Sequence, residues 1–96
     1  MKIRLVVSIN AAPGKGAELA QAFRQRCADV AKESGCEQFE VFQSVVNPDK
    51  LALLELWSDQ AALDVHRTAQ AYTTVYQPQV LPLVNREPHP STLVSG

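Results

Sequence analysis

The length and charge of this chain limit it to one small domain with no electrostatic reason to bind nucleic acid. Its 96 residues form a single domain, residues 1–96. A chain this short buries only about two-thirds of its unfolded surface, so a partner subunit would support its core. Hydrophobic residues make up 46%, charged residues 20%, and the formal net charge is −1, as in ordinary soluble globular domains.

The sequence carries no targeting, membrane or metal signal. Residues 1–10 alternate between apolar and polar side chains without a signal-peptide cleavage site, and no segment approaches the roughly 18 to 20 apolar residues of a membrane span. We therefore expect a cytoplasmic protein without membrane association. Cys27 and Cys36 form no CxxC motif, and no cluster of His, Asp and Glu has metal-ligand spacing, so we expect reduced thiols and no metal.

The first two predicted elements are a strand and an amphipathic helix. Residues 3–10 alternate, which places apolar side chains on one face of a strand. Apolar residues then recur at helical spacing, and Gly35 is expected to supply the left-handed cap at the C-terminal end of that helix. The apolar positions are Ile3, Leu5, Val7 and Ile9 in the strand and Leu19, Phe23, Cys27 and Val30 in the helix.

A β-hairpin is predicted next. Residues 36–46 are rich in β-branched and aromatic side chains, and the sequence Asn-Pro-Asp-Lys at 47–50 is a strong turn signal before the apolar run 51–57. The two segments are therefore expected to pair as antiparallel strands. Both faces of the second strand carry apolar residues.

A second helix is predicted directly after this hairpin. Ser58 is expected to be its N-cap, with Asp59 in the first turn, where a carboxylate complements the helix dipole. Leu63 and His66 lie three positions apart and therefore share one side of the helix.

The C-terminal third is predicted to be interrupted by prolines. We expect a break in the helix at residues 68–70 and then a helical stripe over 72–83. Pro78 lacks the amide that the helix requires, so a kink or a break is expected near residues 74–77. The tail, residues 85–96, contains two more prolines, so a strand there is expected only at a sheet edge or at residues 91–94.

The order strand, helix, strand, strand, helix, strand predicts an α+β, ferredoxin-like βαββαβ domain with helices on one face of an antiparallel sheet. We expect the other face to be apolar as well, and monomers seldom tolerate such an exposed patch. Two copies packed sheet to sheet would cover it, so a homodimer is predicted. The residues expected in this patch are Val6, Phe42, Val46, Leu53 and Trp57.

Two blocks, LELWS at 54–58 and ALDVH at 62–66, are the most specific part of a pattern that covers nearly the whole chain. Together they resemble the antibiotic biosynthesis monooxygenase family of dimeric α+β barrel proteins. The resemblance implies a homodimer with a pocket between sheet and helices, and oxygenation or isomerisation of a small ring or carbonyl compound without metal or flavin. Further matching positions are Pro13-Gly14, Gly35-Cys36, Phe39-Glu40-Val41-Phe42 and Asn47-Pro48-Asp49.

The chain also departs from parts of that family. Many members follow the helix with a Ser-Pro-His-Phe type turn, where a second pocket histidine is sometimes found, whereas this chain reads Ala-Gln-Ala-Tyr at 69–72. Relatives that degrade haem have an axial histidine where Tyr76 falls here and a catalytic tryptophan near the position of His66, so haem breakdown is disfavoured. Family isomerases that act on a phosphorylated sugar derivative have a pattern close to Val-His-Arg-Thr at 65–68.

His66 is the candidate catalytic residue, because an imidazole titrates near neutral pH and can take up and return a proton. In a cofactor-free oxygenation it would help to form the substrate anion, which passes an electron to dioxygen inside an apolar pocket. The alternative interpretation is a structural histidine in the core.

The candidate substrate-binding residues each have a structural alternative. Trp57 would line the pocket or belong to the core or dimer interface. Glu55 would orient His66 or, as the favoured interpretation, form a salt bridge across the dimer with an arginine such as Arg4 or Arg67. Four further candidates would supply hydroxyl donors (the two tyrosines), the pocket rim (the asparagine) or an aromatic surface (the phenylalanine). Their structural alternatives are packing and turn formation. These candidates are Tyr72, Tyr76, Asn10 and Phe42; His89, between two prolines, is expected to be exposed.

The sequence therefore predicts a small cofactor-independent monooxygenase of an aromatic, quinol-like or polyketide-like compound. An isomerase that uses the same histidine and a non-catalytic ligand-binding dimer are the alternatives. Motifs for phosphate-binding glycine loops and for serine nucleophiles are not found.

Overall fold

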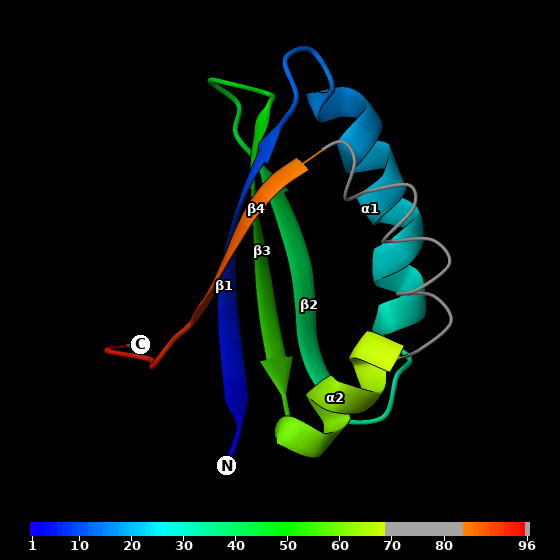
Figure 1. The fold of residues 1–96 in the computed structure, drawn as a ribbon, viewed down its shortest axis with the longest axis vertical. Helices are drawn as coiled ribbons and strands as arrows, with labels where there is room; N and C mark the ends of the chain where they lie inside the picture. The colour runs from blue at the N-terminus through cyan, green and yellow to red at the C-terminus, as the bar shows by residue number, and fades with distance from the viewer. Residues whose placement is uncertain (69–83, 96) are drawn as a thin grey trace.

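The computed structural model describes residues 1–68 and 84–95 of the chain (Figure 1). The predicted order of strands and helices is confirmed. The elements are β1 (Ile3–Ala11), α1 (Gly16–Val30), β2 (Cys36–Gln43), β3 (Lys50–Trp57), α2 (Gln60–Thr68) and β4 (Val84–Pro90). Residues 69–83 lie outside the described residues. They include the helical stripe expected over 72–83, the kink or break expected before Pro78, Tyr72 and Tyr76. They also include the break expected at 68–70, except for Thr68.

The four strands form one antiparallel sheet in the order β2-β3-β1-β4. Helices α1 and α2 lie on the same side of this sheet, which gives the ferredoxin-like α+β fold that was predicted (Figure 1). Neither of the described helices is long and apolar enough to cross a membrane.

The core lies between the sheet and the helices. Alternate residues of β1 and β3 face the helices, because successive side chains of a strand point to opposite faces. In α1 the apolar residues with helical spacing point back at the sheet. The largest buried apolar side chains are Trp57, Phe23, Ile9, Leu19, Leu53, Val7 and Val30.

The strand register corrects the residues expected on the outer face of the sheet. Leu53 pairs with Val7 and Trp57 pairs with Ile3, and residues directly opposite each other share a face, so both lie on the helix-covered face and are buried. Val46 follows β2 in the turn and is exposed. The large apolar residues on the outer face of the described strands are Val6, Phe42, Leu54 and Leu56, and this group is called the outer patch below.

Gly35 does not cap α1, contrary to the prediction. The helix ends at Val30, and the residue that follows, Ala31, has right-handed φ and ψ angles of −60° and −20°. Gly35 has a φ of +82°, but it lies in the turn before β2. A Cβ atom on Gly35 would lie 2.5 Å from the Ala62 Cβ, so its positive φ and small size let this turn approach α2 closely.

The N-cap of α2 is Asp59 and not Ser58. The Asp59 Oδ1 atom accepts a hydrogen bond from the Ala62 amide at 2.8 Å, which is the bond of an N-cap to the third helical residue. Ser58 instead donates its amide to the Gly35 carbonyl at 2.8 Å, so it still belongs to the extended segment.

β4 is an edge strand, as its prolines required. It pairs only with β1 among the described residues and contains Pro88 and Pro90. The strand comprises residues 84–90. Residues 91–94, where a strand was expected as the alternative, form no strand.

The predicted turn at 47–50 joins the hairpin and also holds the start of α1. The Asp49 carboxylate accepts hydrogen bonds from the amides of Gly14 at 3.0 Å and Gly16 at 2.9 Å. Gly16 is buried, and a Cβ atom on it would overlap the Pro48 carbonyl group. The hairpin and the β1–α1 connection are therefore packed backbone to backbone.

Replacing Asp49 by alanine is expected to lower the free energy of unfolding by about 2 kcal/mol, because two charge-assisted hydrogen bonds to backbone amides are lost. Urea unfolding followed by the fluorescence of Trp57, the one tryptophan in the sequence, measures this. The control is Asp64→Ala, which removes an exposed carboxylate that, among the described residues, accepts only from the Gln60 side chain. Equal losses in both variants would contradict the role given to Asp49.

Candidate functional site

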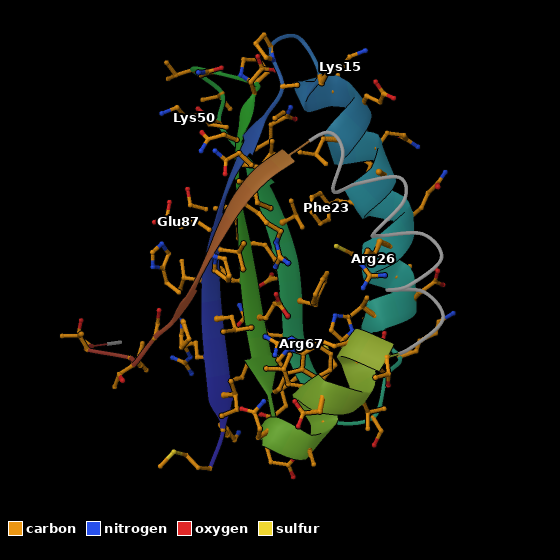
Figure 2. The ribbon with its side chains drawn as sticks, in the orientation of Figure 1. Lys15, Phe23, Arg26, Lys50, Arg67 and Glu87 are labelled. Carbon is orange, nitrogen blue, oxygen red and sulfur yellow. The ribbon has the colours of Figure 1, made fainter. Side chains whose placement is uncertain are left out.

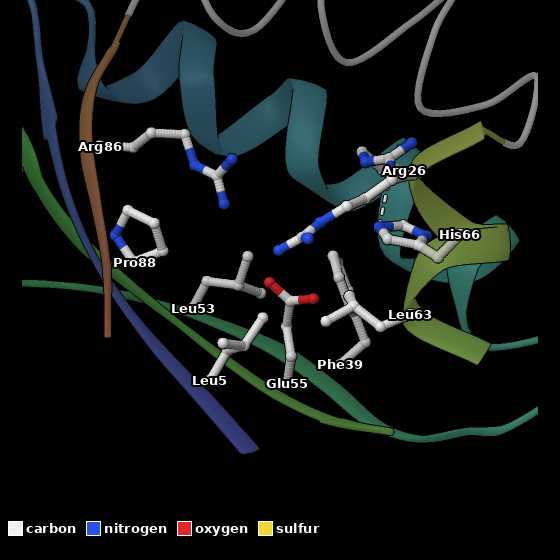
Figure 3. A pocket seen from close by; sticks show the side chains of 10 residues that line it. Leu5, Arg26, Phe39, Leu53, Glu55, Leu63, His66, Arg86 and Pro88 are labelled. Carbon is white, nitrogen blue, oxygen red and sulfur yellow. Dashed lines mark hydrogen bonds between the residues drawn. The ribbon is translucent and has the colours of Figure 1, made fainter. Parts of the chain in front are cut away.

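A cavity of about 200 Å³ lies on the helix-covered side of the sheet (Figure 3). Among the described residues, strands β1 to β4 and helices α1 and α2 all contribute to its lining. Apolar and charged side chains both contribute to it. The described residues that line the cavity are Leu5, Arg26, Phe39, Leu53, Glu55, Leu63, His66, Arg67, Arg86 and Pro88.

His66 lines this cavity from α2 and is only 4% exposed. Its Nδ1 atom lies 2.9 Å from Glu33 Oε1, and its Nε2 atom lies 3.4 Å from Arg26 Nη2. A guanidinium group can only donate, so Nε2 is the acceptor and Nδ1 carries the hydrogen that is donated to Glu33. The carboxylate thus sets the tautomer and leaves the basic nitrogen toward Arg26 and the cavity.

Two aromatic rings hold the imidazole in place. The ring centroid of Trp57 lies 4.6 Å from that of His66 with the planes 32° apart, and the ring of Phe39 lies 5.9 Å away. Trp57 also donates its Nε1 hydrogen to Glu55 Oε1 at 2.9 Å. The side chain of His66 is therefore positioned by packing on two sides as well as by hydrogen bonds.

Burial lowers the pKa of His66 below its usual 6.5, since a desolvated imidazolium is costly. Glu33 opposes this by its hydrogen bond and charge, while the charge of Arg26 adds to the lowering. His66 is consequently neutral at neutral pH, so its contact with Glu33 is a hydrogen bond from a neutral ring. A neutral imidazole is the form that can accept a proton.

Glu55 makes a different contact from the two that were expected. It is 4% exposed, and its carboxylate accepts from the indole of Trp57. The carboxylate that orients His66 is Glu33, and within the described part of the subunit Glu55 forms no ion pair with Arg4 or Arg67. An arginine partner for Glu55 across a dimer stays a prediction.

Some of the other predicted site residues lie away from this cavity. Phe42 is 53% exposed and belongs to the outer patch. Asn10 is exposed near the end of β1, where it pairs with Lys50 and Asn85. Neither residue is among those that line the cavity, because both point to the opposite face of the sheet from His66. His89 is exposed, as expected.

Three charged residues of the site were not predicted. Arg26 lies three positions after Phe23 and four before Val30, so the helical periodicity did place it on the buried side of α1. Arg86 shares the inner face of β4 with Pro88, which is visible only once the edge strand is placed. Glu33 lies in the turn after α1, where no local pattern marks it.

The cysteines and the acidic residues offer no second reactive centre in residues 1–68 and 84–95. Cys27 and Cys36 are free and partly buried, and burial raises the pKa of both thiols, which keeps them protonated at neutral pH. No group of three or more His, Cys, Asp or Glu side chains in these residues is arranged to hold a metal ion.

Residues 2–77 match the family model described as antibiotic biosynthesis monooxygenase. The chain belongs to this family. The resemblance read from the sequence is therefore confirmed at the level of the family.

Several solved structures have the same fold as this chain although their sequence identity to it is low. A cofactor-independent oxygenase from Streptomyces nogalater is 15% identical with a TM-score of 0.84, and the match covers 99% of this chain and 95% of that one. A putative antibiotic biosynthesis monooxygenase from Nitrosomonas europaea is 18% identical (TM-score 0.83, coverage 99% and 94%). A conserved protein from Methanosarcina mazei Go1 is 24% identical (TM-score 0.80, coverage 96% and 94%). A comparison with curated proteins finds no match.

Acidification is expected to destabilise the protein through His66. Because the pKa of His66 is lower in the folded protein than its usual 6.5, the unfolded chain binds the proton more readily. The stability that the neutral ring contributes is present above the unfolded-state pKa and is lost as the pH falls through the folded-state pKa. Urea unfolding at about pH 7.5 and about pH 5.5 measures the loss.

Two histidine variants separate this effect from general acid destabilisation. His66→Gln is expected to lose less stability than the wild type between the two pH values, because the titrating group is gone. His89→Gln, at an exposed position on β4, is expected to retain the wild-type loss. An unchanged acid loss in His66→Gln would refute the assignment.

Proposed function

We propose that this protein is a cofactor-independent oxygenase of a small aromatic compound of the phenol or quinol type, with His66 as its general base. The observation that carries the proposal is a buried, neutral imidazole that borders a cavity and has its tautomer set by a carboxylate. The family supports it, as does the fold shared with a cofactor-independent oxygenase from Streptomyces nogalater.

The cavity supplies the two conditions that this chemistry needs. Nε2 of His66 can accept a substrate proton when the substrate hydroxyl replaces the hydrogen bond from Arg26 at that nitrogen, and Glu33 then stabilises the imidazolium through Nδ1. Leu5, Leu53 and Leu63 give apolar walls that keep water from the reactive intermediates. The enzyme's task is then to form the substrate anion beside dioxygen in a dry site.

The reaction balances for a phenol with a hydrogen on the ring carbon opposite the hydroxyl group. His66 takes the hydroxyl proton, and the phenolate gives one electron to dioxygen, which forms a phenoxyl radical and superoxide. These combine through a carbon–oxygen bond, and His66 returns the proton to the peroxide. Loss of the ring hydrogen with hydroxide then releases water and leaves a quinone, so one oxygen atom enters the product and the other enters water.

The second candidate is an isomerase of a small phosphorylated carbonyl compound. The arginines that line the cavity favour this reaction, because a guanidinium group can donate two parallel hydrogen bonds to the oxygens of one phosphate group. The same histidine would move a proton between neighbouring carbons, and no dioxygen would be consumed. Ligand binding without turnover is the remaining alternative.

Oxygen uptake with a panel of phenols and quinols tests the assignment of His66. We expect the wild type to consume oxygen and His66→Gln to lose about a hundredfold or more in kcat, since general base catalysis is typically worth that much. His89→Gln is the matched control and should retain full activity. Full activity in His66→Gln would disprove the assignment of the base, and the absence of uptake with every compound would favour the isomerase or a binding protein.

Glu33 is proposed as a positioning residue for His66, and its test uses the pH profile. Glu33→Gln removes a group that raises the pKa of His66, so the acid limb of kcat/KM should move to lower pH while kcat falls by less than in His66→Gln. A Glu33→Gln profile that coincides with the wild-type profile would show that this carboxylate does not act through the imidazole.

We also propose that two subunits pack through the outer patch. Val6 is 37% exposed and Phe42 is 53% exposed in the isolated subunit, although both are large and apolar. Leu54 and Leu56 continue the same surface across β3. A second copy would remove this surface from water, and each large side chain so covered contributes on the order of 2 kcal/mol.

Sedimentation at micromolar concentration tests the homodimer. The wild type is expected to sediment as a dimer and Phe42→Asp to shift toward monomer, because a charge within the interface would be buried without a partner. Val65→Asp is the matched control, since Val65 is 65% exposed on α2, away from the outer patch. A monomeric wild type, or equal effects of the two substitutions, would count against the interface.

A further inference from the structure

The cavity carries more positive charge than a neutral phenol requires. Three arginines line it from three separate elements, Arg26 from α1, Arg67 from α2 and Arg86 from β4. Among the described lining residues, Glu55 is the one carboxylate. Figure 3 shows the guanidinium group of Arg86 and the carboxylate of Glu55 extending into the cavity from opposite sides.

Burial keeps this positive charge effective. Arg26 is 1% exposed, and a guanidinium group stays protonated in proteins, so its charge is held in a poorly solvated place. Its contact with His66 is to a neutral ring. Residues 69–83 contain no Asp or Glu, so the sequence supplies no further carboxylate from that segment.

The remaining residues that line the cavity are suited to binding an aromatic ring. Leu5, Phe39, Leu53, Leu63 and Pro88 are apolar, so the cavity combines an apolar wall with a cationic one. Its volume of about 200 Å³ is below the roughly 300 to 1,000 Å³ of sites for drug-sized ligands, which limits the ligand to one ring with small substituents.

We propose that the cavity selects a small organic anion, a one-ring aromatic carboxylate whose acidic group binds at Arg86 and Arg67 beside Arg26. Arginine matches a planar carboxylate through two parallel hydrogen bonds, and a desolvated charge pair of this kind is strong. The aromatic part rests on the proposed function, whereas the preference for an anion rests on the arginines alone. A phosphate ester shares the recognising chemistry and is distinguished by the test.

Isothermal titration calorimetry of the full chain under argon tests binding separately from turnover. The probes are para-hydroxybenzoate, the equally shaped but uncharged para-hydroxybenzamide, and phenyl phosphate. We expect para-hydroxybenzoate to bind at least about tenfold tighter than the amide, and added salt to weaken only the anions. Tighter binding of phenyl phosphate than of the carboxylate would move the ligand class to phosphate esters and overturn the choice of carboxylate.

Arginine variants locate the anion. Arg86→Gln and Arg67→Gln are each expected to weaken para-hydroxybenzoate by about tenfold and to leave the amide unchanged, because one charge-assisted pair is lost. Arg67 is exposed on α2, so its variant remains informative if Arg86→Gln unfolds. Arg24→Gln is the matched control: Arg24 is exposed on α1, bonds to Gln21 and does not line the cavity.

Each outcome separates this inference from the proposed function. Equal affinity for the carboxylate and the amide, no detectable binding of either anion by folded protein, or equal effects of Arg67→Gln and Arg24→Gln would overturn the anion site. Oxygen uptake with neutral quinols would then still support the oxygenase. If the carboxylate binds through the two arginines and no substrate consumes oxygen, the anion site stands and the oxygenase falls.

Discussion

The contact of His66 with Glu33 is the interaction on which the candidate site depends. Burial removes the charge from the imidazole, and the carboxylate decides which nitrogen carries the remaining hydrogen. Without Glu33 the ring could present either nitrogen to the cavity, and without burial it would be partly protonated near neutral pH. Trp57 and Phe39 then fix the plane of a ring that is already in its basic form.

The two faces of the sheet have different physical roles, and this separation follows from strand geometry. The inner face carries the core and, at one end, the cavity under the helices. The outer face carries an apolar surface. The helices α1 and α2 lie on the other side of the sheet and do not cover it (Figure 2). A shift of the strand register by one residue would exchange these faces. The pairing of β1 with β3 therefore determines both the cavity and the outer patch.

The arginines that line the cavity connect the proposed oxygenase reaction with the proposed anion site. An anionic group held by arginines would orient an aromatic ring against the apolar wall and bring its reactive position toward His66. The positive charge of Arg26 has a second effect, because it helps to keep the imidazole neutral. Under these proposals one buried arginine would contribute both to the selection of a charged ligand and to the protonation state of His66.

The sequence by itself determined the described elements, their order and the buried side of β1, α1 and α2, but not that of β3, whose two faces are both apolar. The alternation in β1 and the three-residue spacing of Leu63 and His66 were sufficient for this, because periodicity is a local property. Only the tertiary structure decided which side chains meet. Glu33 lies 33 positions before His66 in a turn without a pattern, and Trp57 faces inward because its strand pairs in one register. Such contacts depend on how distant elements pack, which no local spacing encodes.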